Sequence, residues 1–140
     1  MNDTMTLGRL TEAKSLAYLT SLGYIVSLPF GGQARYDLLV DVNGKIIKIQ
    51  VKSSQYENGC IVFYTCNSHY IQGHHVHTTY TENDIDYFMT EYNEQYYLVP
   101  VTECGKQKKL RIEIPKSGAS TKNINWAKDY LAQEVLKSLE

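Results

Sequence analysis

Residues 36–53 read YDLLVDVNGKIIKIQVKS. Two β-rich runs, 36–42 and 45–53, flank the dipeptide Asn43-Gly44. This dipeptide favours a two-residue hairpin turn because both of its residues tolerate a positive φ. The stretch therefore predicts two antiparallel strands whose register is set by the turn.

That register separates an apolar face of the hairpin from a polar one. On the polar face, Asp37 lies opposite Gln50, and Lys52 is its diagonal neighbour, within reach of a long side chain. Lys48 belongs to the same face. The other face is apolar and is predicted to meet the core, with Tyr36 opposite Val51, Leu38 opposite Ile49 and Val40 opposite Ile47. A polar face of this kind either contacts solvent alone or forms a functional site.

The polar face combines residue types that suit metal-assisted chemistry. Asp37, the backbone carbonyl of Val51 and the amide of Gln50 offer oxygen atoms, which a hard divalent cation prefers. Lys52 beside them is able to orient or deprotonate a water, or to stabilise charge on a phosphate. Glu12, on the first predicted helix, is the candidate for a second carboxylate, and a solvent-facing glutamate is the alternative. Such a set suits the hydrolysis of phosphodiester bonds.

The flanking sequence predicts one helix near each end of the chain and several strands between them. Amphipathic helices are expected over residues 7–22 and 126–139, and a polar loop over 67–81. Two glycines, Gly31 and Gly32, allow unusual backbone angles in the loop before the hairpin. Further strands are expected at residues 24–28, 60–66, 85–90, 95–101 and 110–114. This order predicts an α/β (α+β) fold in a single domain over residues 1–140, with a mainly antiparallel sheet flanked by helices.

The composition indicates an ordinary globular protein. Of its 140 residues 43% are hydrophobic, which is enough to bury a core without disulfides. No apolar run reaches the length of a membrane span and no signal-peptide pattern opens the chain, so we expect a cytoplasmic protein. The cysteines, Cys60, Cys66 and Cys104, are expected to be free thiols. Histidines near Cys66 match the spacing of a zinc site only loosely.

The hairpin and the first helix resemble the PD-(D/E)xK nucleases of the restriction-endonuclease-like fold. The similarity is carried by the strings Gly8-x-x-x-Glu12, Tyr36-Asp37-Leu38 and Ile49-Gln50-Val51-Lys52-Ser53, and it continues through residues 24–30, 84–88 and 97–101. The chain is most similar to the small branch that includes the homing endonuclease of a cyanobacterial group I intron. The archaeal Holliday junction resolvases are more distant relatives.

This resemblance implies an activity and a role for each matching residue. The implied activity is that of a Mg²⁺-dependent endonuclease acting on double-stranded DNA. Asp37 is implied to bind the metal, Lys52 to be the catalytic lysine, and Glu12 to be the glutamate that the family carries on its helix. Two residues depart from the family pattern: Tyr36 replaces the proline, and Gln50 replaces the acidic residue, which removes a negative charge from the metal site.

The charges are segregated along the chain, which is typical of a one-sided binding surface. The net charge of −1 combines an acidic stretch at residues 82–103 with a basic one at 106–122. Phosphate contacts, which dominate the affinity for nucleic acid, are expected from Arg35, Lys48, Lys108 and Lys109. A solvated turn is the alternative for residues 105–109.

Several functions remain open from the sequence. Because one domain carries one active site, cutting both strands predicts a homodimer or homotetramer. The alternatives are a structure-specific nuclease such as a Holliday junction resolvase, a catalytically inactive nucleic-acid-binding domain of the same fold, and an interaction domain.

Overall fold

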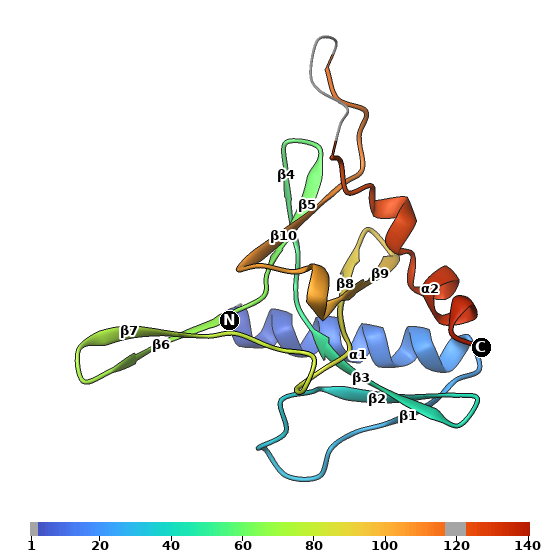
Figure 1. The fold of residues 1–140 in the computed structure, drawn as a ribbon, viewed down its shortest axis with the longest axis horizontal. Helices are drawn as coiled ribbons and strands as arrows, with labels where there is room; N and C mark the ends of the chain where they lie inside the picture. The colour runs from blue at the N-terminus through green and yellow to red at the C-terminus, as the bar shows by residue number, and fades with distance from the viewer. Residues whose placement is uncertain (1–2, 117–122) are drawn as a thin grey trace.

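The hairpin of residues 36–53 lies at the centre of the main sheet (Figure 1). The computed structural model describes residues 3–116 and 123–140, without the side chains of 67–70 and 77. Its elements, in chain order, are α1 (Thr4–Ser21), β1 (Ile25–Ser27), β2 (Leu38–Val42), β3 (Lys45–Val51), β4 (Gln55–Glu57), β5 (Cys60–Tyr64), β6 (Asn67–Ile71), β7 (His74–Thr78), β8 (Tyr87–Tyr92), β9 (Gln95–Pro100), the 3-10 helix η1 (Val101–Glu103), β10 (Gln107–Arg111), the 3-10 helix η2 (Ala127–Tyr130) and α2 (Ala132–Ser138).

The main sheet has the strand order β1-β2-β3-β8-β9, in which only the β3–β8 pair is parallel. A second sheet, β10-β5-β4, and the β6–β7 hairpin complete the described strands. The fold is therefore a mixed, mainly antiparallel α+β structure, as predicted. No helix in the described residues is long and apolar enough to cross a membrane.

The β2–β3 register confirms the prediction made from the turn. Val42 pairs with Lys45 and Leu38 with Ile49, and both turn residues have a positive φ, 53° at Asn43 and 90° at Gly44. The ladder ends at the pair of Leu38 and Ile49. The expected ladder pairs of Tyr36 with Val51 and of Asp37 with Gln50 are therefore not formed, because the chain leaves the strand at Asp37.

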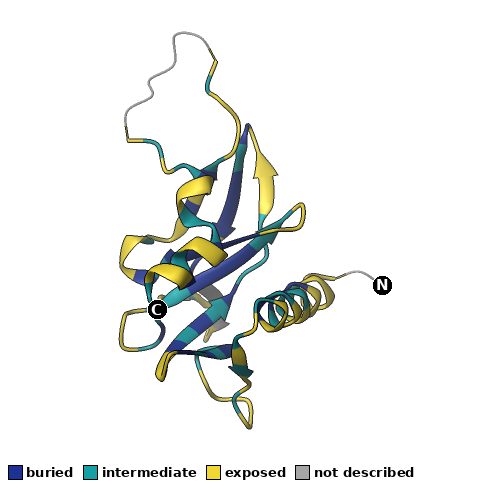
Figure 2. Cartoon of the chain, turned by 90° about the vertical axis from the view of Figure 1, so that its right-hand side faces the viewer, coloured by how far each residue is buried: buried dark blue, intermediate teal, exposed yellow. Residues whose placement is uncertain are grey.

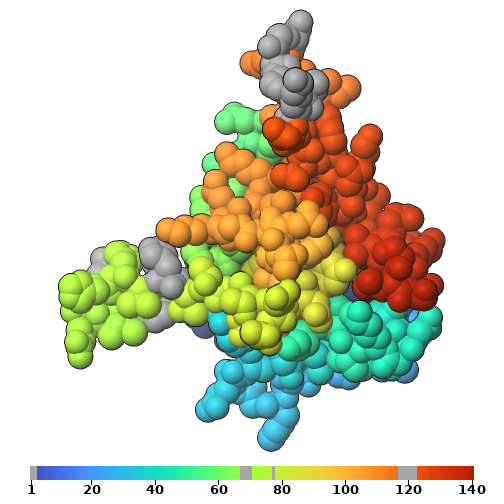
Figure 3. All heavy atoms as spheres, viewed as in Figure 1, coloured from blue at the N-terminus to red at the C-terminus, as the bar shows by residue number. Residues whose placement is uncertain are grey.

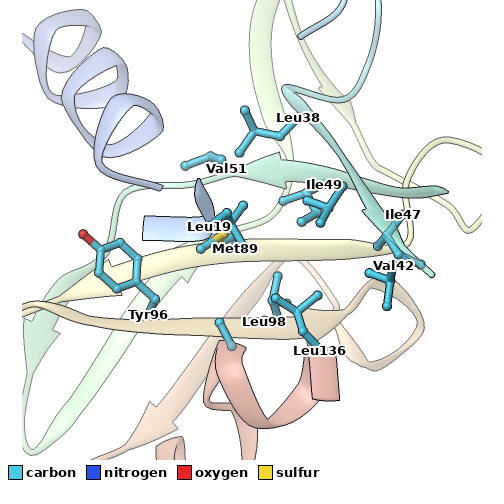
Figure 4. Packing of buried hydrophobic residues seen from close by; sticks show 12 residues of the cluster. Leu19, Leu38, Val42, Ile47, Ile49, Val51, Met89, Tyr96, Leu98 and Leu136 are labelled. Atoms are coloured by element: carbon cyan, nitrogen blue, oxygen red, sulfur yellow. The ribbon is translucent and has the colours of Figure 1, made fainter. Parts of the chain in front are cut away.

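The apolar face of the hairpin belongs to the hydrophobic core, as its alternation predicted. Leu38, Val40, Ile47 and Ile49 are at most 2% exposed. Figure 4 shows this cluster, in which the hairpin side chains pack with residues of α1, β8, β9 and α2, including Leu19, Met89, Leu98 and Leu136. A second cluster lies where β8 and β9 meet the β5–β10 strands and η2, and includes Phe63, Phe88, Val99 and Leu110. The strands β8 and β9 are thus buried on both faces.

Helix α1 contacts the sheet along a narrow line of mostly small residues. It begins after Asp3, whose side chain accepts a 2.8 Å hydrogen bond from Thr6 N. Its buried residues are Thr11, Ser15 and Leu19, spaced four apart, and the outer side of the helix is exposed (Figure 2). The small Thr11 and Ser15 side chains bring this part of α1 close to the strands, and this part also carries the candidate Glu12.

Three expectations about the other elements are wrong in detail. Residues 67–81 were expected as a polar loop, but 67–78 form the β6–β7 hairpin, which extends away from the rest of the chain (Figures 1 and 3). The expected strand at 110–114 is β10 at Gln107–Arg111, because this segment pairs with β5. The expected helix over 126–139 is interrupted at Leu131, where the backbone is extended and bridges to Tyr97 of β9. The three cysteines are free thiols, as predicted.

Candidate active site

Asp37 and Lys52 lie at the open end of the β2–β3 hairpin, and backbone hydrogen bonds hold both positions. Asp37 N donates to Ile49 O and its carboxylate oxygen Oδ2 accepts from Val51 N, both at 2.8 Å. These two bonds attach Asp37 to β3 on either side of Gln50. Lys52 N donates to Met89 O, also at 2.8 Å, which continues the β3–β8 pairing by one residue. The carboxylate and the lysine are thereby held directly beside the ends of the adjacent strands β2 and β3.

Helix α1 brings a second carboxylate to the same place. The Thr11 hydroxyl lies 2.8 Å from that of Ser53, the residue directly after Lys52. The next helix residue, Glu12, lines a cavity of about 260 Å³ together with Asp37. The loop residues Gly31, Gly32 and Ala34 also line this cavity, with Leu28, Pro29 and Tyr36. The structure therefore brings together Glu12 and Asp37, which are far apart in the chain.

The electrostatics of the three side chains are coupled. Burial raises the pKa of Asp37, against the lowering effects of the Val51 N–H and of the Lys52 charge. Burial also raises the pKa of Glu12, and the negative charge of Asp37 adds to that effect. Burial lowers the pKa of Lys52, and the charge of Asp37 opposes the change. A cation bound between the carboxylates would relieve the cost of ionising both of them.

The carboxylates that line this cavity, with neutral oxygens of the adjoining β3 residues, have the chemistry that a hard divalent cation prefers. Gln50 is half-buried in β3, between the two backbone positions that hold Asp37. Within the part of the chain that the structure describes, no three acidic, histidine or cysteine side chains form a metal site by themselves. Two carboxylates supplemented by a neutral oxygen, from Gln50 or the Val51 carbonyl, are nevertheless a donor set that Mg²⁺ accepts. The side chains of His69 and His77, from the loosely matching zinc site, lie outside the described residues.

Arg35 and Tyr80 lie beside Lys52 and form the cationic flank of the site. Arg35 makes a 2.9 Å ion pair with Asp84 and donates to Thr79 O at 3.0 Å. Its guanidinium carbon lies 4.2 Å from the centroid of the Tyr80 ring, and Lys52 Nζ lies 5.3 Å from the same centroid. Sequence reasoning missed Tyr80, because nothing in the chain distinguishes it from eleven other tyrosines.

The other three lysines that were predicted to contact phosphates differ in exposure and in hydrogen bonding. Lys109 is exposed on β10. The half-buried Lys48 donates to Asn83 O at 3.1 Å. Lys108 is only 8% exposed, and its ammonium donates to Glu103 O at 3.0 Å. Alternation along the strand turns Lys108 inward and Lys109 outward, so the burial of Lys108 argues against the predicted phosphate contact there.

Several carboxylates of the acidic stretch, residues 82–103, are engaged in contacts within the protein. Asp84 pairs with Arg35, and Asp86 accepts a 2.8 Å hydrogen bond from Lys48 N. Glu91 pairs with Lys14 of α1 at 2.9 Å. These carboxylates connect β8 and the segment before it to the elements that carry the site.

Comparison with known proteins gives one family and one fold. The family model described as PD-(D/E)XK endonuclease matches residues 2–133. Among solved structures, a bacterial homing endonuclease, I-Ssp6803I, is similar to this chain with a TM-score of 0.78 and 24% sequence identity, over 98% of this chain and 95% of that chain. This likeness concerns the fold. No curated protein matches the chain.

Proposed function

Because the chain belongs to the PD-(D/E)XK endonuclease family, we propose that it is a Mg²⁺-dependent endonuclease that cuts double-stranded DNA. The observation that carries the proposal is the cavity shared by Glu12 and Asp37, with Lys52 held directly beside the end of the adjacent strand β3. The name of the structural neighbour, a homing endonuclease, supports DNA as the substrate. The proposed nuclease domain comprises residues 1–140.

Each residue of the site has a proposed part in the reaction. Asp37 and Glu12 would hold the cation through their carboxylates, and Gln50 or the Val51 carbonyl would add a neutral oxygen. When bound, Mg²⁺ supplies Lewis-acid activation of water and neutralises charge on the phosphate. Lys52 orients the attacking water and accepts its proton or, when charged, stabilises the negative charge that develops on the phosphate. The bond from Val51 N fixes the orientation of the Asp37 carboxylate.

The proposed DNA surface continues from the site over its cationic flank. Arg35, Lys48 and Lys109 are proposed to contact phosphates, and Lys108 is left out of this surface because it is buried. Lys106 joins it, since it lines a cavity of about 320 Å³ together with Tyr80. We further propose that two or four chains assemble, so that one active site acts on each strand. Light scattering in solution tests this assembly: a monomer that only nicks DNA would contradict it.

The experiment that tests the activity uses plasmids that carry randomised inserts. The protein is incubated with this library in MgCl₂ or in EDTA, and the DNA ends that appear are sequenced. We expect cleavage only with MgCl₂, and a loss of about a hundredfold or more in Lys52→Ala, the usual contribution of an acid–base residue. Lys137→Ala, at an exposed position on α2, is the matched control and should cut normally.

The remaining outcomes distinguish the alternative functions. A wild-type protein that binds DNA without cutting it would be a binding domain of the nuclease fold. A protein that neither binds nor cuts would be an interaction domain. Preferential cutting of a four-way junction in a parallel reaction would identify a junction resolvase.

A further inference from the structure

The loop between β1 and β2 carries an aromatic side chain that is entirely exposed. Phe30 has a relative exposure of 107%, higher than that of the other exposed large hydrophobic residues in the described chain, and nearby Leu28 is 57% exposed. Figure 3 shows this loop protruding at the lower edge of the molecule. An exposed phenylalanine forgoes the stabilisation that burial provides, which is typical of a residue that contacts a partner.

The same loop forms a wall of the cavity that contains the two carboxylates. Pro29 and Gly31, the residues on either side of Phe30, both line that cavity with Glu12 and Asp37. Gly31 has a φ of +88°, and no atom lies within 4 Å of the place where its Cβ would be. A phosphate bound to a cation that Glu12 and Asp37 would hold in this cavity would have its adjoining nucleotides beside Phe30.

The charge around this loop indicates which part of the nucleic acid it meets. Residues 15–34 contain no Asp, Glu, Lys, Arg or His, whereas Arg35, Lys48 and Lys52 lie on the hairpin side of the site. The part of the loop around Phe30, residues 28–34, therefore has no charged side chain of its own with which to attract phosphates. Bases, in contrast, present apolar faces that stack on aromatic side chains, and apolar wedges enter base steps from the minor groove.

We propose that Phe30 stacks on a DNA base at the step next to the scissile phosphate and holds that step partly unstacked during cleavage. This inference rests on the proposed function, because it takes DNA to be the substrate. The position of Phe30 beside the catalytic cavity favours DNA over a second copy of the chain as its partner. Phe30 is thus a positioning residue for the substrate, outside the set that binds the metal.

A fluorescence experiment tests the contact directly. Trp126 is the only tryptophan, so Phe30→Trp combined with Trp126→Phe gives a single reporter in the loop. The Lys52→Ala substitution is added to keep the DNA intact, and the probe is a short duplex with the sequence recovered from the plasmid library. We expect DNA to quench the reporter and to shield it from acrylamide. The matched control is Ile114→Trp with the same two substitutions; Ile114 is 86% exposed, and its reporter should stay accessible.

A binding measurement provides an independent test. With Lys52→Ala present, Phe30→Ala should weaken binding of the same duplex about tenfold, as expected for the loss of one stacked base, and Phe30→Trp should restore it. Unchanged affinity together with an unshielded reporter would overturn the inference while leaving the nuclease proposal intact. Shielding that depends on protein concentration without DNA would identify a second copy as the partner and also overturn it. A wild type that neither binds nor cuts DNA would overturn both proposals.

Discussion

At the scale of single residues, the charge of the buried Asp37 has two opposite effects. It is the form that would bind a cation, but without a cation it is unfavourable for the stability of the fold. Burial raises its pKa above the ordinary value, so the ionised form that would bind a cation is the less favourable one in the folded protein. A group whose pKa is raised in this way stabilises the fold below its unfolded-state pKa. That stabilisation is lost as the pH rises through the folded-state pKa. At neutral pH without metal, the Asp37 charge therefore destabilises the fold.

Asp37→Asn should accordingly have a higher Tm than wild type at neutral pH in EDTA, and the difference should vanish in acid. Adding MgCl₂ should raise the Tm of the wild type alone, because only the wild type retains the Asp37 carboxylate that the proposal assigns to the cation. Cleavage should be lost. Thermal unfolding followed by circular dichroism checks each point, with Asp129→Asn on the exposed face of η2 as the control. A lower Tm for Asp37→Asn in EDTA would contradict the account.

Gln50 is the residue at which this chain departs most from the family pattern, and its effect on the metal site is measurable. Gln50→Glu adds a carboxylate beside the strand positions that hold Asp37. We expect Mg²⁺ to bind about tenfold more tightly, since ligand charge sets the affinity of such sites, and the Tm in EDTA to fall through carboxylate repulsion. Titration of the Tm with MgCl₂ measures both effects. An unchanged Mg²⁺ dependence would show that Gln50 lies outside the metal site.

At the scale of elements, a part-buried hydrogen bond helps to set the position of α1 against the sheet, together with the Lys14–Glu91 ion pair. Thr11 is 5% exposed, and its hydroxyl donates to Leu7 O within the helix. Since a hydroxyl has one proton to donate, Thr11 accepts the 2.8 Å bond from the Ser53 hydroxyl. Since Glu12 and Lys52 are the chain neighbours of these two residues, the bond couples the helix to the catalytic strand end.

Thr11→Val should lower the free energy of unfolding by about 1 kcal/mol or more, the usual cost of leaving a buried hydroxyl unpaired. It should also reduce cleavage, because Glu12 would lose its fixed position. Denaturant unfolding of Thr11→Val, Ser53→Ala and the double variant gives the coupling energy. The control is Thr20→Val, which removes a bond within the same helix but no bond to the sheet. Strictly additive effects would mean that the two hydroxyls act independently.

The elements that sequence reasoning missed share a physical cause. The β6–β7 hairpin belongs to neither of the two larger sheets, and its strands have no alternation of apolar and polar residues that could distinguish them from a loop. Its turn, Gln72-Gly73, has positive φ at both residues, as Asn43-Gly44 does. The break at Leu131 arises from pairing with β9, a tertiary contact that overrides the helical spacing of residues 126–139.

At the scale of the whole molecule, positive and negative side chains nearly balance, and some of them pair with each other. The net charge is −1, and several acidic side chains pair with internal partners, such as Asp84 with Arg35 and Glu91 with Lys14. The affinity for DNA therefore depends on the few cations that remain exposed, and we expect it to fall steeply with salt.

The neighbouring lysines Lys108 and Lys109 provide a matched pair for testing this surface. Lys109→Ala should reduce the slope of log K against log salt by about 0.9, the value for one phosphate contact. Lys108→Met should leave that slope unchanged, because the Lys108 ammonium is bonded to Glu103 O inside the protein. Fluorescence anisotropy with a labelled duplex over a range of NaCl concentrations measures both slopes. A reduced slope in Lys108→Met would return Lys108 to the binding surface.

The amino-acid sequence alone was sufficient to predict the features that depend on local chemistry. The Asn43-Gly44 turn and the alternation around it set the register of β2 and β3, and this register brought Asp37 and Lys52 to the same end of the hairpin. Turn geometry and side-chain alternation depend on residues close together in the chain, so a single sequence is enough to predict them. The composition also predicted a globular protein that buries a hydrophobic core without disulfides.

Only the tertiary structure decided which distant groups meet. Glu12 reaches Asp37 because small buried residues let α1 approach the sheet, Tyr80 packs beside Lys52, and Lys108 turns inward on β10. Each outcome depends on packing between segments far apart in the chain, where burial competes with charge. The tertiary structure also decided which charges are paired inside the fold, such as Arg35 with Asp84, and the near-zero net charge gives no sign of this.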